Sequence, residues 1–326
     1  MKTLSVRLYN KEYYHKWNEF VAQAKNATFL FHRDFMEYHQ DRFQDFSLVV
    51  TDENESIKAI LPANRVKDTV FSHKGLTYGG LVINNKAKMS DFIVLFQEVL
   101  KFLNENEIKN LELKVLPSIY CDFPSDELEY LAFLCKAELI RKDTLSVLDL
   151  KTDFRYTTDR KQALAKSLKN DLEVREEQNF DLFWSEILIP NLAEKHQVKP
   201  VHSLHEITLL KERFPKNIRQ FNVYLKDKVV AGTTIFETKN VAHSQYISGN
   251  SDKNQLGSLD FLHHYLLTEV FQNKKYFDFG ISNENQGRNI NSGLLYWKES
   301  FGARTITQSF YRFDSKNYEK LNSVLI

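Results

Sequence analysis

The sequence predicts a mixed α/β (α+β) protein made of two similar domains, each a mixed, mostly antiparallel sheet flanked by helices. Three observations support this prediction. The chain has 326 residues, a length that suits two domains of ordinary size. Hydrophobic residues make up 42% of the chain and aromatic residues 13%, which is enough to fill two packed cores. Finally, the order of helix-like and strand-like patterns in the first half recurs in the second.

The first half begins with helix-like patterns and continues with strands. Apolar residues recur at helical spacing at its start, as in Trp17, Phe20 and Val21, and again from Phe92 to Leu103. Between these helices lie short β-prone runs, separated by turn residues and by Gly79-Gly80. We expect helices over 12–25, 33–43 and 91–105, and strands over 46–51, 57–65, 70–73 and 111–116.

The second half repeats this order of helices, hairpin, strand, glycine break, helix and strand. We expect helices over 154–170, 180–194, 205–214 and 259–272, and strands over 221–225, 229–237, 241–248 and 276–280. The repeat is the size of a domain, which favours a duplication over a solenoid; the alternative is a coincidence of two ordinary α/β patterns. We place the boundary after the strand 145–150, giving domains 1–150 and 151–326.

Charge and cysteine content exclude several classes of protein. Lys and Arg number 44 against 43 Asp and Glu, a net charge of +1, which argues against a bulk electrostatic nucleic-acid binder but leaves room for a local basic patch. Two cysteines form no disulfide framework, and with dispersed histidines they predict no metal site. The start has no signal-peptide pattern, and no apolar stretch is long enough to span a membrane. We expect a cytoplasmic protein, with peripheral contact to the inner face of the membrane left open.

The repeated unit has the element order of the GNAT acyltransferase core. In that core a central strand and the helix after it hold an acyl-pantetheine arm and its pyrophosphate. Several longer motifs of the second half are distinctive in combination: 198–207, Arg213-Phe-Pro, Val230-Ala-Gly, 242–246, 276–284, Asn291-Ser-Gly-Leu and 298–304. Together they resemble bacterial FemAB-like tandem-GNAT proteins of the kind found among cell-surface polysaccharide genes.

The resemblance implies an N-acyltransferase with one acyl-transfer site. It would move an acyl group from acyl-CoA, with acetyl-CoA as the expected donor, to an amine of a cell-envelope or surface-polysaccharide precursor. That acceptor is a small molecule or is linked to a lipid or nucleotide. Two alternatives remain open: an aminoacyl-tRNA-dependent FemAB-type transferase, and a non-catalytic scaffold in polysaccharide assembly. The balanced charge favours CoA over tRNA.

The donor is expected in domain 151–326, and domain 1–150 is expected on the acceptor side or in a structural role. The stretch that matches the GNAT phosphate loop has a single glycine and no Arg. The loop 84–90 of the first domain has no glycine, so we expect no donor there. The residues expected to hold the donor are Ser248, Gly249, Gln255, Leu256, Gly257 and Ser258.

Acyl transfer to an amine needs a base, an oxyanion donor and a proton for the leaving thiolate. Either His243 or Glu284 is the expected base, and Tyr246 would protonate the thiolate. Asp278 lies within an aromatic strand, where a carboxylate is costly unless it is paired or has a raised pKa. The alternatives are a buried structural His, a core Tyr, a structural Asp and a solvated Glu.

Four further residues are expected to bind the acceptor. Asn291 and Lys298 follow Glu284 on the next helix, and Lys298 would bind a carboxylate or phosphate. His73 and Tyr78 occupy the corresponding place in the first domain, facing the cleft or doing structural work in a decayed duplicate.

Overall fold

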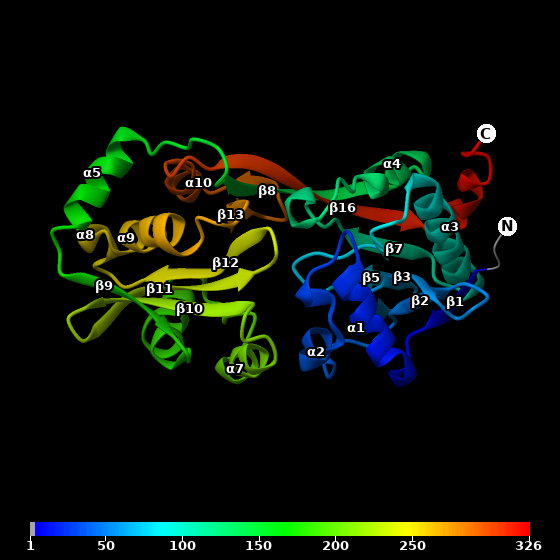
Figure 1. Cartoon of the computed structure of the whole chain (residues 1–326), viewed down its shortest axis with the longest axis horizontal. Helices are drawn as coiled ribbons and strands as arrows, with labels where there is room; N and C mark the ends of the chain where they lie inside the picture. Colours follow the sequence, from blue (N-terminus) through cyan, green and yellow to red (C-terminus); the bar gives the residue numbers. More distant parts are fainter. Residues whose placement is uncertain (1–3) are drawn as a thin grey trace. The chain divides into compact units, whose positions relative to one another are not determined.

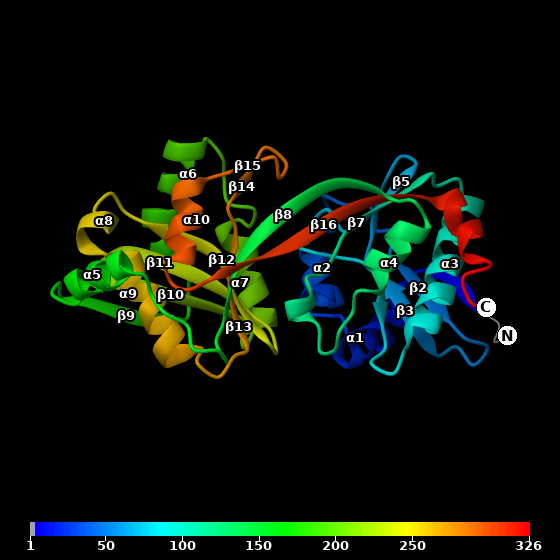
Figure 2. The same ribbon diagram turned by 90° about the horizontal axis from the view of Figure 1, so that it is seen from above.

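The computed structural model describes residues 4–326, apart from the side chains of residues 195 and 196. Its contacts divide the chain into two compact units, drawn in Figures 1 and 2. Unit 1 consists of Met1–Asp143 and Thr307–Ile326, and unit 2 of Thr144–Ile306.

This division differs from the expected boundary in the C-terminal segment. Residues 307–326 belong to unit 1, whereas the sequence assigns them to the second domain. The strand β16 (Arg304–Asp314) pairs there with β7 (Asn110–Lys114), and the buried side chains of Phe313 and Leu321 join the core of unit 1. The strand β8 (Glu138–Asp149) begins in unit 1 and ends in unit 2. The roles assigned to the two domains stay predictions.

Unit 1 contains a four-stranded sheet, four strands of a ten-stranded sheet, and two main helices. Its helical elements are η1 (Lys11–Tyr13), α1 (Tyr14–Gln23), η2 (Phe29–Phe31), α2 (Arg33–Met36), η3 (Glu37–His39), α3 (Met89–Glu105), η4 (Ser118–Tyr120), α4 (Glu127–Leu134) and η7 (Ser315–Leu321). Besides β7, β8 and β16, its strands are β1 (Ser5–Leu8), β2 (Leu48–Thr51), β3 (Ile57–Leu61), β4 (Asn64–Val66), β5 (Thr69–Ser72) and β6 (Val82–Ile83).

The two groups of paired strands in unit 1 differ in strand direction. The order β1-β2-β3-β6 is antiparallel throughout, and the order β4-β5-β7-β16 contains one parallel pair, β5 with β7. The apolar face of α3 contributes seven buried residues to the core, and these residues recur at helical spacing. All four residues of β2 are buried, so both faces of that strand are covered.

Unit 2 is built around one sheet with helices on both faces. Its helical elements are α5 (Thr158–Ser167), the π-helix η5 (Phe183–Leu188), α6 (Ile189–His196), α7 (Leu204–Arg213), α8 (Lys253–Leu256), α9 (Ser258–Tyr265), the π-helix η6 (Leu266–Val270) and α10 (Ser292–Glu299). Its strands besides β8 are β9 (Leu172–Glu177), β10 (Ile218–Leu225), β11 (Lys228–Glu237), β12 (Val241–Gly249), β13 (Tyr276–Ile281), β14 (Asn283–Glu284) and β15 (Asn289–Ile290).

The sheet of unit 2 has the strand order β8-β13-β12-β11-β10-β9. Only β12 and β13 run parallel; the other neighbours are antiparallel. In Figure 1, α9 lies above β11 and β10 and α7 lies below them. Phe183 of η5 packs against Gly232, while Leu262 of α9 joins a core with Ala231, so neighbouring residues of β11 face different layers. The predicted fold class, a mixed and mostly antiparallel sheet with flanking helices, is therefore confirmed.

Several elements depart from the predicted ones. Pro62 divides the expected strand 57–65 into β3 and β4, because proline cannot donate to a ladder. The expected helix 154–170 begins only at Thr158, where the hydroxyl of Thr157 caps it. The described residues contain no helix that is long and apolar enough to cross a membrane.

Candidate functional site

The central feature of unit 2 is the divergence of its two parallel strands. The ladder between β12 and β13 contains only three pairs and ends at His243 opposite Asp278. Both strands continue beyond this point, β12 to Gly249 and β13 to Ile281, without pairing with each other. The edge of β12 that faces β13 is therefore left without a ladder partner after His243. Unpaired main-chain groups at such an edge can bind an extended ligand as an added strand.

A histidine and an aspartate lie at this divergence point. Nδ1 of His243 is 3.0 Å from Oδ2 of Asp278. The aspartate side chain is fully buried, and that of His243 keeps 13% of its surface exposed. Because a carboxylate accepts, the pairing puts the imidazole proton on Nδ1 and leaves a lone pair on Nε2. The structure thus brings two of the four predicted catalytic residues together as a histidine oriented by a buried carboxylate.

The second oxygen of Asp278 is held by the backbone. Its Oδ1 accepts the N–H of Gly280 at 2.7 Å, so the buried carboxylate is fixed on both sides. Gly280 has a φ of +74°, a conformation that side chains other than glycine rarely adopt. A Cβ at this position would stand 3.4 Å from Cε1 of His243. The glycine therefore lets the chain turn directly beside the imidazole.

Lys298 of α10 lies beneath this turn. Its ammonium donates to the main-chain oxygens of Gly280 at 3.0 Å and of Ile281 at 2.6 Å. Burial lowers the pKa of this ammonium to about 8, and the charge of Asp278 partly opposes the shift. The predicted acceptor ligand is thus a buried side chain with main-chain partners, which suits a positioning role.

Each of the two diverging strands also contains a bulge near the site. Thr234 and Ile235 of β11 pair with Tyr246 and Ser244, so Gln245 is the extra residue of β12. On β13, the register with β8 shifts between Asp278 and Ile281. Bulges bend a strand and redirect its side chains, which accounts for the separation of β12 from β13.

Tyr246 has its own set of partners, separate from the His243–Asp278 pair. Its hydroxyl is 2.6 Å from Nδ1 of His202 and accepts the N–H of the same residue at 3.1 Å. Its ring packs edge-on against Trp184 of η5. These contacts tie the loop before α7 to the sheet, and a role for Tyr246 in protonating a thiolate stays a prediction.

Glu284 and Asn291 lie on exposed chain beyond the end of β13. Nδ2 of Asn291 donates to Oε1 of Glu284 at 3.2 Å, while its Oδ1 caps α10 at Leu294. Glu284 belongs to the short hairpin of β14 and β15. Its role as a base stays a prediction.

The expected donor loop is only partly open to solvent. Gln255 is exposed and Leu256 is half-buried, but Gly257 and Ser258 are buried. A Cβ on Gly257 would stand 2.8 Å from Cβ of Ser167, so α5 packs directly on the glycine. The N–H of Gly257 already donates to Lys253. In this arrangement the loop does not present its glycine to a pyrophosphate.

The end of β12, where Ser248 and Gly249 are expected to bind the donor, is held in place by Asn191. Nδ2 of Asn191, on α6, donates to Oγ of Ser248 at 2.8 Å and to the oxygen of Gly249 at 2.6 Å. Asn191 is absent from the sequence expectations, whereas His202 and Gly280 lie within the motifs 198–207 and 276–284 that carry the resemblance but have no role assigned there. Only Gly280 carries a signal, because it ends a buried aromatic strand where a tight turn demands glycine.

In unit 1, the two predicted acceptor residues are placed differently. Tyr78 is buried, and its hydroxyl donates to Oγ1 of Thr28 at 2.9 Å. His73 follows β5, where the parallel pairing with β7 ends, and it lines a surface pocket. The equivalence of His73 and His243 suggested by the sequence is thus also a likeness of position, since each comes where a parallel pair ends.

Comparison with known proteins identifies the fold. No family model and no curated protein matches the sequence. Among solved structures, FemX superimposes with a TM-score of 0.65 at 9% identity over 98% of this chain and 99% of its own. The C-terminal domain (DUF2156) of a putative lysylphosphatidylglycerol synthetase from Agrobacterium fabrum gives 0.59 at 12% identity, over 95% of this chain and 94% of its own. A tandem GNAT protein from the clavulanic acid biosynthesis pathway gives 0.51 at 12% identity, over 96% and 99%.

These likenesses define the fold. The chain has the fold of FemX and of this tandem GNAT protein, so the FemAB-like tandem-GNAT resemblance drawn from the sequence motifs is confirmed at the level of the fold.

Proposed function

We propose that this protein is a transferase that moves an acyl group from an activated carrier to an amine, with His243 as the base. The observation that supports it best is the His243–Asp278 pair at the point where β12 and β13 diverge. The pantetheine arm of an acyl-CoA donor would lie along the free edge of β12. Fold similarity to FemX and to a tandem GNAT protein supports the same class of reaction.

The chemistry follows from the orientation of the imidazole. The amine nitrogen attacks the acyl carbonyl, and Nε2 of His243 takes the amine proton as the new C–N bond forms. The tetrahedral intermediate then collapses, the bond to the carrier breaks, and the proton returns from Nε2 to the leaving sulfur or oxygen. Asp278 holds the imidazole in the required tautomer and stabilises its cation. No side chain forms a covalent intermediate.

Acyl-CoA is the proposed carrier, and the acceptor is an amine of a cell-envelope or surface-polysaccharide precursor. The test is release of free thiol from acetyl-CoA in the presence of amino sugars. We expect turnover in the wild type and a loss of about 10²–10⁴-fold in His243→Ala, the usual contribution of a general base. Full activity in His243→Ala would overturn the assignment of the base.

A second carrier, aminoacyl-tRNA, is favoured by two observations. The burial of Gly257 and Ser258 under α5 leaves little room for a pyrophosphate at the start of α9. In addition, Lys161, Lys166 and Lys169 on and beside α5 are all exposed. If tRNA is the carrier, charged tRNA should bind at low salt, and replacing these three lysines with glutamine should weaken binding and flatten its salt dependence. The absence of binding at low salt would exclude this carrier.

A further inference from the structure

A surface pocket of about 400 Å³ lies in unit 1, and nothing in the proposed transfer reaction uses it. It is formed by α2, η3 and the loop that leads to β2, together with His73 after β5. This volume is in the range of about 300–1,000 Å³ that small-molecule sites occupy.

The walls of the pocket are predominantly acidic. Three carboxylates line it, those of Glu37, Asp41 and Asp45, against one guanidinium, that of Arg33. The neighbouring Arg42 is not among the lining residues; its guanidinium lies over the ring of Tyr38. The pocket therefore has an excess of negative charge.

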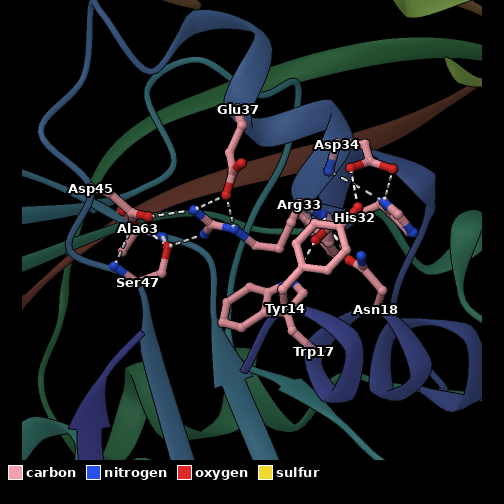
Figure 3. A network of polar contacts seen from close by, with 11 residues as sticks. Tyr14, Trp17, Asn18, His32, Arg33, Asp34, Glu37, Asp45, Ser47 and Ala63 are labelled. Carbon is pink, nitrogen blue, oxygen red and sulfur yellow. Dashed lines mark hydrogen bonds and ion pairs between the residues drawn. The ribbon is translucent and has the colours of Figure 1, made fainter. Parts of the chain in front are cut away.

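The guanidinium of Arg33 is already fully engaged. Figure 3 shows it between Glu37 and Asp45, to which it is paired at 3.0 Å and 2.5 Å, and within reach of Ser47. It also lies 3.8 Å over the ring of Tyr9. Asp41, by contrast, is exposed and forms no ion pair within residues 4–326. Asp41 is therefore the carboxylate that can pair with a positively charged ligand.

His73 supplies a hydrogen-bond donor of a different kind. Only 4% of its surface is exposed, and its Nδ1 accepts the N–H of Gly75 at 3.0 Å. Burial lowers its pKa to about 3, so the ring is neutral. A neutral ring that accepts at Nδ1 carries its proton on Nε2, and the side chain lines the pocket. The N–H of this largely buried side chain is therefore a donor that a ligand in the pocket can use.

We propose that this pocket binds a small primary ammonium that has a hydroxyl or carbonyl oxygen on a neighbouring carbon, as in an amino sugar or amino alcohol. The ammonium lies among Glu37, Asp41 and Asp45, and the oxygen accepts Nε2–H of His73. Three carboxylates against one guanidinium favour the cation, with Asp41 as the carboxylate that has no ion pair among the described residues, and the neutral imidazole favours an uncharged acceptor over a second cation. The inference is independent of the proposed transfer reaction.

Calorimetric titration of the full chain at low salt tests the charge requirement. Glucosamine carries the ammonium and the neighbouring hydroxyl, whereas N-acetylglucosamine keeps the hydroxyl and has a neutral acetamide in place of the ammonium. We expect glucosamine to bind and N-acetylglucosamine not to bind. Asp41→Asn should weaken glucosamine binding by about 3- to 10-fold, as the loss of one partly exposed charge partner does. Glu105→Gln, which removes an exposed carboxylate at the end of α3, is the matched control and should change nothing.

A second pair of ligands tests the hydrogen bond proposed for Nε2–H of His73. In the wild type, 2-aminoethanol should bind more tightly than propylamine, and His73→Phe should abolish the difference while keeping a ring in the aromatic setting of Phe43. If His73→Phe does not fold, the comparison of the two amines in the wild type still decides. Equal binding of glucosamine and N-acetylglucosamine, equal binding of the two simple amines, or full affinity in Asp41→Asn would overturn the proposal.

Discussion

At the scale of the residue, Asp278 is the most constrained group of the candidate site. It is fully buried, one oxygen accepts from Gly280, and the other meets Nδ1 of His243. A buried carboxylate is stable only with such partners, so the pair contributes to folding as well as to the proposed chemistry. A substitution that keeps the shape of the side chain but changes which imidazole nitrogen carries the proton separates the two contributions.

Asp278→Asn is that change. The amide can donate to Nδ1, which would move the imidazole proton to Nε2 and remove the base. We expect transfer to fall by about 10²–10⁴-fold while the protein stays folded. Nitrogen-15 NMR of the imidazole provides a readout independent of activity and should show the change of tautomer. Glu284→Gln is the matched control; an equal loss in that variant would make Glu284 the base instead.

A second buried histidine makes unit 2 sensitive to acid. His263 is fully buried among aromatic rings, and burial lowers its pKa to about 4. The unfolded chain takes up this proton near pH 6.5 and the folded chain only near 4. Between these values the unfolded state binds more protons, so stability falls as the pH falls from 6.5 to 4, by at most about 3 kcal/mol for this group.

His263→Phe should therefore shift the acid unfolding midpoint to lower pH. The ring fits the aromatic surroundings of Phe279 and Trp297, although the bond from Nδ1 to the oxygen of Leu259 is lost. Circular dichroism during acid titration measures the shift. His205→Gln, at an exposed position on α7, should leave the midpoint unchanged; an unaltered midpoint in His263→Phe would contradict the argument.

At the scale of the element, the bulged end of β13 decides the geometry of the site. Gly280 turns the chain at positive φ beside His243. Lys298 donates to the main-chain oxygens of Gly280 and Ile281. Lys298 of α10 thus holds the end of β13 in place where this strand separates from β12. A bulge of this kind re-aims the residues that follow it.

Gly280→Ala should cost about 1–2 kcal/mol, because alanine at positive φ is strained. The added methyl would also press on the imidazole, so transfer should fall more than the change in stability explains. Gly293→Ala is the contrasting variant: its Cβ would meet only ordinary contacts on α10, and it should be neutral or stabilising. Thermal melts and rates measure both. Equal effects from the two substitutions would show that the turn at Gly280 has no special role.

At the scale of the whole molecule, unit 1 is assembled from both ends of the chain. Phe313 of β16 is fully buried and packs edge-on against Phe96 of α3 at 5.1 Å. Oγ of Ser315 donates to the oxygen of Ile108, and Nδ2 of Asn317 to that of Cys135. The core of unit 1 therefore closes only after the last twenty or so residues are in place.

Phe313→Ala should destabilise unit 1 by about 3–5 kcal/mol, the usual cost of removing a buried phenylalanine. Hydrogen exchange should show the loss of protection in α3 and β7, which are distant in sequence from residue 313. Protection in β10 and β11 of unit 2 should change little. Loss confined to residues 144–306 would contradict this assignment of the C-terminal segment.

The periodic patterns predict most of the main helices and strands, because burial of one face leaves a regular apolar spacing. The 17-residue helix α3 and the strands β10 to β13 are examples. The strands β9 and β16 are not predicted. Both are mixed in burial and rich in charged or polar residues, so neither shows the alternation that marks a half-buried strand.

The candidate site can likewise be predicted only in part from the sequence. The types of residue at His243 and Asp278 are visible in the sequence, and so is the cost of a carboxylate inside an aromatic strand. Their contact depends on the parallel register of β12 and β13, which joins residues 35 positions apart. The same is true of Lys298, which is buried and donates to a main-chain oxygen. Its role as an acceptor ligand stays a prediction.

The mixed fold, the recurring pattern of elements and their GNAT-like order can be predicted from the amino-acid sequence, because they follow from local spacing and burial along the chain. The three-dimensional packing places residues 307–326 in unit 1 and α5 over Gly257. It also decided that the two strands part at His243 and Asp278. These features depend on contacts between distant segments, whose free energies are shared among many residues and leave no periodic signal in any one of them.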